Sequence, residues 1–188
     1  INLENKPANI DALDGIVNIL PHGVDYNFQN EFSNLVDAYR KNEQVQGSTL
    51  GLFMLSAIPV DRAEPSESLM ATTVWSAGIP KKTDILLSEN QIASFIADNP
   101  ITPEIDIRAG RGAYLVNFSK NIRAKNKLDW YIIVEINQST TAAVDLNHLI
   151  RHTPDLIDLV TSDIAKGTEN LKRMVSLSDG FQITNTEI

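Results

Sequence analysis

Apolar residues recur at intervals of three and four positions in the first part of the chain. This spacing places them on one face of an α-helix and predicts a helix over 8–20, with Asn9 as its cap. A second helical pattern runs from Phe28 through Tyr39 to about residue 42, so residues 8–42 are predicted to form N-terminal helices. The apolar positions of the first helix are Ile10, Leu13, Ile16, Val17 and Leu20.

Two strand-like stretches follow the predicted helices. Residues 49–59 are rich in Leu, Phe, Met and Ile, and residues 69–76 contain Thr, Val and Trp. The charged segment 61–67 between them contains a proline, which indicates a hairpin with an exposed loop. Ser88 and Gln91 have the spacing of a capping box and predict a short helix that ends near residue 98.

The second half of the predicted core, which spans 48–138, contains three more strands. They lie over 105–108, 113–118 and 128–137, and the basic segment 123–127 joins the last two as a turn. A pair of strands, a crossing helix and a three-strand meander indicate an α+β fold. The predicted arrangement is a five-stranded antiparallel sheet with helices on one face, within a single domain over 1–188.

Two helices are predicted over 141–178. The first covers 141–151, and the second opens at Thr153-Pro154-Asp155, a capping residue followed by a proline and an acid, and ends at 178–180. Apolar residues along the second helix alternate in steps of three and four, as in a coiled coil. This seam either meets a partner helix or packs on the chain's own sheet. The residues of the seam are Ile157, Val160, Ile164, Leu171 and Met174.

Composition excludes several classes of function. The 188 residues carry 16 Lys and Arg against 24 Asp and Glu, a net charge of −8, which gives no electrostatic support for binding nucleic acid. The chain contains no cysteine, which rules out disulfides, thiolate metal sites and cysteine nucleophiles. No dinucleotide or phosphate-binding glycine motif is present. We therefore expect no cofactor, no catalytic residue and no nucleic-acid partner.

A helical group of three residues has the spacing of metal ligands. Asp145, His148 and His152 fall on one face of the predicted helix over 141–151 and its end. Leu149 stands where a zinc-protease motif needs glutamate, so that motif fails. We interpret the three residues as solvated surface side chains and expect no metal site.

Polar and aromatic side chains among the predicted strands are candidates for a ligand pocket. Arg108 and Arg111 are suited to holding a carboxylate in a bidentate pair. The other candidates would supply stacking and hydrogen bonds. Alternatively, the aromatic residues belong to the core and the arginines pair with surface acids. The candidate ligand-binding residues are Trp75, Arg108, Arg111, Tyr114, Asn117 and Tyr131.

The segment Lys127-Leu128-Asp129-Trp130-Tyr131-Ile132-Ile133-Val134-Glu135-Ile136-Asn137-Gln138-Ser139 resembles the closing strand of Cache or periplasmic PAS-like sensor domains. The predicted order of elements over 8–175 is similar to that of the same family. The resemblance implies a PAS-like sheet whose ligand, a carboxylate or an amino acid, lies between the sheet and the helix at 88–98. It also implies an extracytoplasmic, periplasmic position in an inner-membrane receptor, which dimerises through its terminal helices.

The favoured hypothesis is therefore the ligand-sensing domain of a bacterial histidine kinase, chemoreceptor or cyclic-dinucleotide enzyme. Because the chain begins with Ile1 and not Met, we expect it to be a piece of a longer protein with membrane spans outside these residues. Two alternatives remain open: an α+β enzyme with a metal at Asp145, His148 and His152, and a dimerisation module without a ligand.

Overall fold

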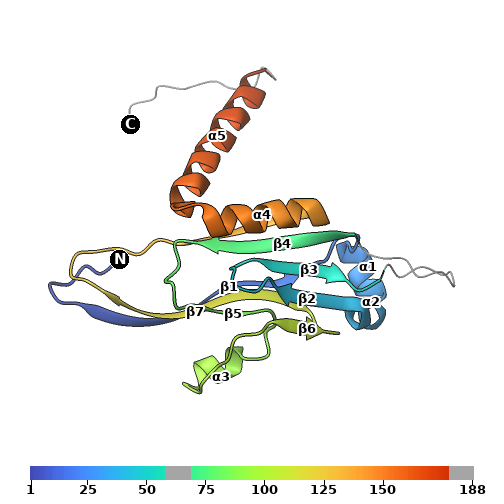
Figure 1. Ribbon diagram of the computed structural model, residues 1–188, viewed down its shortest axis with the longest axis horizontal. Coiled ribbons are helices and arrows are strands. Elements are labelled where there is room, and N and C mark those ends of the chain that lie inside the picture. The colour runs from blue at the N-terminus through green and yellow to red at the C-terminus, as the bar shows by residue number, and fades with distance from the viewer. Residues whose placement is uncertain (58–68, 178–188) are drawn as a thin grey trace, which may run out of the picture. The chain divides into compact units, whose positions relative to one another are not determined.

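Two antiparallel sheets form the body of the chain in the computed structural model, which describes residues 1–57 and 69–177 (Figure 1). The smaller sheet has three strands and the larger sheet has five. Both sheets belong to a compact unit over Ile1–Thr153, and a second unit begins at Pro154. The predicted α+β class is confirmed, but the single predicted sheet is not: a five-stranded sheet is present, its members differ from the predicted strands, and a second, three-stranded sheet stands beside it.

The strands are not arranged in chain order. The smaller sheet has the order β1-β7-β5 and the larger sheet the order β6-β2-β3-β4-β8. The bounds in the smaller sheet are β1 (Ala8–Ile19), β5 (Asp84–Leu86) and β7 (Gly112–Ile122). Those in the larger sheet are β2 (Arg40–Gln44), β3 (Gly51–Leu55), β4 (Met70–Ala77), β6 (Asp106–Arg108) and β8 (Tyr131–Ser139).

The helices of the first unit lie outside the two sheets. They are α1 (Tyr26–Glu31), α2 (Ser33–Tyr39), α3 (Ile92–Ile96) and α4 (Thr140–His152). The predicted helix after Phe28 is confirmed as two short pieces, α1 and α2, and the predicted helix over 141–151 is confirmed as α4. Ser139 caps α4, since its side chain accepts a hydrogen bond from the Ala142 backbone N–H.

The predicted helix over 8–20 is wrong, because this segment forms strand β1 at the edge of the smaller sheet. Ile10, Ala12 and Ile16 pack against the core between the sheets, at the two-residue spacing of a strand face. Asp14 occupies the intervening position on that face, opposite Val116. This acid interrupts the alternation and leaves a spacing that imitates a helix.

Two local features explain why β1 is nevertheless a good strand. Asp14 Oδ2 accepts a hydrogen bond of 2.7 Å from Trp130 Nε1, so its polar group has a partner. Gly15 allows a close approach to the neighbouring strand, since a Cβ atom built there would lie 2.0 Å from the Tyr114 carbonyl oxygen. Glycine is also unfavourable in a helix interior, which argues against the helical reading.

The predicted meander of the last three strands is also wrong. Residues 105–108, 113–118 and 128–137 do contain strands, but none of these strands is paired with another of the three. β6 pairs with β2, β7 pairs with β1 and β5, and β8 pairs with β4. The sequence pattern shows where a strand lies and not which strand it pairs with.

The second unit consists of α5 (Leu156–Leu177) within the described residues. The predicted helix is confirmed, but its cap is Asp155, whose Oδ1 accepts hydrogen bonds from the backbone N–H groups of Ile157 and Asp158, both at 3.0 Å. The predicted loop over 61–67, the end of the strand at 58–59 and the helix end at 178–180 lie outside the described residues.

The main core lies between the two sheets. Phe53 and Val74 from the larger sheet contact Ile85, Tyr114 and Val116 from the smaller sheet. Every one of these side chains is at most 2% exposed, so this layer is closed to solvent. Burial of this apolar surface is the main force that holds the two sheets face to face.

Tyr114 also carries the polar connection between the sheets. Its hydroxyl donates to the Thr49 carbonyl oxygen at 2.6 Å and lies 2.9 Å from Ser76 Oγ, which acts as the donor because the tyrosine proton is already used. Burial raises the pKa of Tyr114 above its ordinary value of 10.0, and hydrogen bonding with the side chains of Ser76 and Thr49 opposes that rise.

We predict that Tyr114→Phe lowers the free energy of unfolding by about 1–3 kcal/mol, because Ser76 and Thr49 lose a buried partner. Unfolded tyrosine ionises above pH 10, whereas folded Tyr114 stays protonated. Its contribution to stability is therefore complete below pH 10 and is lost as the pH rises further. Denaturant unfolding curves from neutral to alkaline pH measure both effects.

Tyr26→Phe is the matched control, because Tyr26 is 73% exposed. It should leave the unfolding free energy unchanged at neutral pH. Equal stability of the wild type and Tyr114→Phe would show that the buried hydroxyl does not hold the sheets together.

Candidate functional site

The structure distributes the predicted ligand-binding residues over several layers. Tyr114 lies between the sheets, whereas Trp75 lies on the opposite face of the larger sheet, one position along β4 from the core residue Val74. Asn117 lies opposite Leu13 on the outer face of the smaller sheet. Tyr131 pairs with Ala77 at the start of β8. The structure therefore does not bring the aromatic residues and Asn117 together in one pocket.

The two arginine candidates pair with different acids. Arg108 Nη2 lies 3.0 Å from Asp106 Oδ2 and 3.9 Å from Glu43 Oε1. Arg111 Nε lies 3.6 Å from Asp37 Oδ2. The side chains of Arg108 and Arg111 are 58% and 55% exposed, so these are solvated ion pairs of small energetic value.

Arg40, a buried arginine that sequence reasoning missed, also pairs with Asp37, the acid that pairs with Arg111. Arg40 is 3% exposed, and its Nε lies 3.0 Å from Asp37 Oδ1 as an ion pair without the alignment of a hydrogen bond. Its Nη1 donates to the Ile19 carbonyl oxygen at 3.0 Å, and its Nη2 donates to Gln29 Oε1. Burial lowers the pKa of Arg40, the Asp37 carboxylate opposes this shift, and Arg111 adds to it. These contacts tie β2 to β1 and α1.

A polar cavity of about 380 Å³ lies beside Arg111. Arg111 already pairs with Asp37, and Glu89 brings a second carboxylate to the cavity. The cavity therefore has no surplus of positive charge for a carboxylate ligand. Its lining residues are Asn18, Ser88, Glu89, Asn90, Gly110 and Arg111.

The predicted capping box beside this cavity does not form. The side chains of Ser88 and Gln91, the two residues of the predicted box, instead donate hydrogen bonds to the buried Glu104 carboxylate. Glu104 Oε1 accepts from Ser88 Oγ and from Gln91 Nε2, each at 2.9 Å. Oε2 accepts from the Leu87 backbone N–H at 2.7 Å. The short helix α3 begins at Ile92, and its N-cap side chain makes no capping bond. This network holds the loop after β5 in place.

The candidate metal residues do not form a metal site. The rings of His148 and His152 stack with centroids 4.1 Å apart, and His152 Nδ1 lies 2.8 Å from the His148 carbonyl oxygen. No group of three or more histidines, cysteines or acids with metal-binding geometry occurs within residues 1–57 and 69–177. The geometry gives the metalloenzyme alternative no support.

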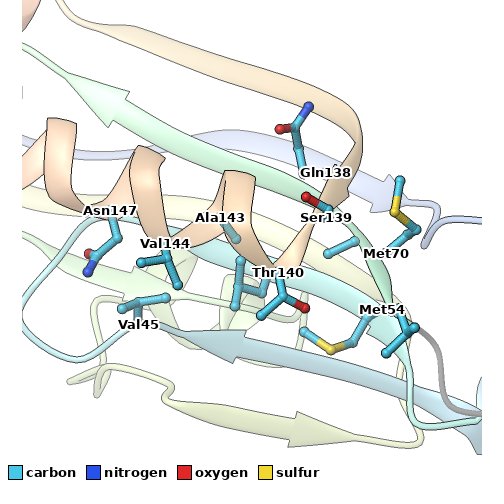
Figure 2. Close-up of a pocket in the computed structure, with 12 residues that line it drawn as sticks. Val45, Met54, Met70, Gln138, Ser139, Thr140, Ala143, Val144 and Asn147 are labelled. Atoms are coloured by element: carbon cyan, nitrogen blue, oxygen red, sulfur yellow. The ribbon is translucent and has the colours of Figure 1, made fainter.

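An apolar pocket lies between α4 and the outer face of the larger sheet, on the side away from the main core (Figure 2). We call it the α4 pocket, and its volume is about 290 Å³. Ligand pockets generally start near ~300 Å³ and have mostly apolar walls, so the α4 pocket has the size of a small-molecule site. Its lining residues are Val45, Leu52, Met54, Leu69, Met70, Ala71, Gln138, Ser139, Thr140, Ala143, Val144 and Asn147.

Strand alternation builds the floor of the α4 pocket. In β3, Phe53 points to the main core, so its neighbours Leu52 and Met54 point to the outer face. Ala71 of β4 lies on the same outer face and leaves room above the sheet. The floor is therefore apolar because both faces of the larger sheet are covered, one by the smaller sheet and one by α4.

Helix α4 supplies the roof. Ala143, Asn147 and Ile150 recur at intervals of four and three, which places them on one helix face. Ala143 and Asn147 line the pocket, and Ile150 is buried. Sequence reasoning missed this site, although an asparagine in an otherwise apolar helix face was its signal.

The chain matches no protein-family model, and the comparison with curated proteins finds no relative. Within the described residues, no helix has both the length and the apolar character required to cross a membrane. The α4 pocket is therefore characterised by its geometry and its chemistry alone.

Proposed function

We propose that this chain is a ligand-sensing domain that binds a small molecule in the α4 pocket and passes binding on as a shift of α4. The observation that carries this proposal is an apolar pocket of about 290 Å³ whose helical wall, in the part of the chain that the structure describes, is α4 alone. A ligand that enters must contact that helix and the sheet together. Binding energy and helix position are then coupled.

The lining of the pocket suits an adaptable binding site. Met54 and Met70 lie toward one end of the pocket, and Val45 and Asn147 lie toward the other (Figure 2). Methionine is flexible and polarizable, so it adjusts its shape to different apolar groups. Small residues such as Ala71 and Ala143 keep the space between helix and sheet open.

Signalling from the α4 pocket requires two positions of α4 that differ in affinity for the ligand. A ligand shifts the population toward the position that it binds more tightly, and by no more than that difference in affinity. α4 is attached directly to β8 through its Ser139 cap, and the chain continues from its other end into α5. A movement of α4 therefore acts directly on the connection to the next helix.

We further propose that the receptor class is the one implied by the resemblance of 127–139, an extracytoplasmic sensor of a bacterial signal-transduction protein. A PAS-like core and a periplasmic position in an inner-membrane protein belong to the same proposal. The strand order of the larger sheet differs from the predicted meander. Support for ligand sensing therefore comes from the pocket and not from the topology.

We predict that 1-octanol binds the full chain and that Ala143→Phe weakens binding at least tenfold, because the aromatic ring fills the space under α4. Isothermal titration calorimetry measures the affinity. Bound octanol should also raise the unfolding free energy by RT ln(1 + [L]/Kd), which is about 2.7 kcal/mol at a hundredfold excess over Kd.

Thr141→Phe is the control for that experiment, since Thr141 lies on the exposed side of α4 and does not line the pocket. It should bind octanol as the wild type does. The pocket is not a binding site if octanol fails to bind, or if Ala143→Phe binds it with unchanged affinity.

A second candidate function, a helix-mediated dimerisation module, is favoured by the exposed apolar residues of α5. Ile164, Leu171 and Met174 are 53%, 62% and 60% exposed and lie along one helical seam. Gly167 falls on the same seam and has open space around it. A second copy of the chain would bury this seam in a two-helix coiled coil.

We predict a concentration-dependent dimer that Ile164→Glu combined with Leu171→Glu dissociates, raising the dimer dissociation constant at least tenfold. Gly167→Leu should act in the opposite direction, because it completes the seam. Analytical ultracentrifugation measures both effects. Ser162→Glu with Ser176→Glu adds the same charges on the exposed opposite face and should leave the association unchanged. A monomer at all concentrations would refute this second function.

A further inference from the structure

One polar atom in the wall of the α4 pocket has no hydrogen-bond partner among the described residues. Asn147 Oδ1 is buried and accepts no hydrogen bond within the described part of the chain. Buried polar groups in folded proteins are almost always satisfied, so an exception calls for a specific cause. An acceptor at a pocket wall is satisfied when a bound molecule donates to it.

Two unsatisfied polar atoms among the described residues lie on the outer side of the larger sheet. The buried side-chain atoms without a hydrogen bond are Arg40 Nε, Trp75 Nε1 and Asn147 Oδ1, among residues 1–57 and 69–177. Arg40 Nε has its ion pair with Asp37, which leaves the other two. Trp75 is buried on the face of β4 that also presents Ala71 to the pocket, and Asn147 lies in the roof. Two buried polar atoms on the outer side of the larger sheet therefore lack hydrogen bonds among the described residues. In the main core, by contrast, the Tyr114 hydroxyl both donates and accepts a hydrogen bond.

The charges around the pocket restrict what can donate to Asn147. None of the twelve lining residues is an acid, a lysine or an arginine. A charged ligand would lose its hydration without gaining a counterion, which is strongly unfavourable. The donor must therefore belong to a neutral group, such as a hydroxyl, an amide N–H or an aromatic N–H.

The position of Asn147 restricts where the donor lies on the ligand. Asn147 and Val45 are toward one end of the pocket, and Met54 and Met70 toward the other (Figure 2). The rest of the lining is mainly apolar, with Gln138, Ser139 and Thr140 as its other polar members. A complementary molecule has its donor at one end and an apolar body that extends toward the methionines.

We infer that the ligand of the α4 pocket is a small, neutral, mainly apolar molecule with one terminal hydrogen-bond donor, and that Asn147 Oδ1 accepts that hydrogen bond. This inference rests on the proposed ligand-binding function of the same pocket and adds the chemical class of the ligand. It also replaces the carboxylate or amino acid expected from the sequence, for which the described lining residues offer no cationic partner.

Two isomeric probes test the inference without any variant. 1-Octanol and 1-methoxyheptane have the same atoms and nearly the same apolar body, but only the alcohol donates a hydrogen bond. We expect calorimetry on the full chain to give octanol about tenfold tighter binding, the ratio of one net hydrogen bond of ordinary strength. Asn147→Leu should bind the two probes with equal affinity, because its side chain cannot accept.

Two further variants separate the role of the acceptor from effects on folding. Asn147→Asp keeps an acceptor and should keep the preference for the alcohol. Thr141→Leu places a leucine on the exposed side of α4 and should keep the wild-type ratio. Equal binding of both probes to the wild type would overturn the inference and leave the proposed function intact. If neither probe binds, both the inference and the proposed function are overturned, and the same holds if both probes bind and Ala143→Phe does not weaken their binding.

Discussion

The contact on which the rest of the fold depends is the packing of Tyr114 between the two sheets. Its ring fills the core, and its hydroxyl joins β7 of the smaller sheet to Ser76 on β4 of the larger sheet and to Thr49 in the loop before β3. With one face of the larger sheet closed in this way, the opposite face is left to be covered by α4. Within the described residues, the side chains of the main core are buried and the Tyr114 hydroxyl has its hydrogen-bond partners, whereas the α4 pocket is an open apolar space on the other face of the larger sheet.

The sequence predicted the fold class and the places of most elements but not their pairing. β4, β6, β7, β8 and α4 follow from local alternation, turn residues and caps, which are short-range signals. β1 was misread because Asp14 interrupts its apolar face, and the bond from Trp130 that accommodates this acid joins residues far apart in the chain. β2 was missed because its residues, 40–44, are polar and charged, and their burial comes from partners elsewhere in the chain.

The candidate site was predictable only in outline. The sequence placed the ligand between the sheet and the helix at 88–98, whereas the α4 pocket lies under α4 and is lined by none of the six predicted ligand-binding residues. The residues chosen for their chemistry are largely occupied by structural contacts: Tyr114 binds across the core and Arg111 pairs with Asp37. Asn147 carried a sequence signal, a polar residue on an apolar helix face, but only the structure shows that its side-chain carbonyl group is buried without a partner among the described residues.

Movement of α4 on ligand binding is the central claim, and a distance measured between two spin labels tests it most directly. The chain has no cysteine, so His148→Cys on the exposed side of α4 and Lys120→Cys on β7 provide two unique attachment points. Pulsed electron paramagnetic resonance with and without 1-octanol then reports the separation of α4 from the smaller sheet. We predict a change in mean distance of about 1–2 Å, the usual size of a signalling helix shift, and no change when Ala143→Phe is added. Binding of octanol with an unchanged distance would show that the pocket holds a ligand without sensing it.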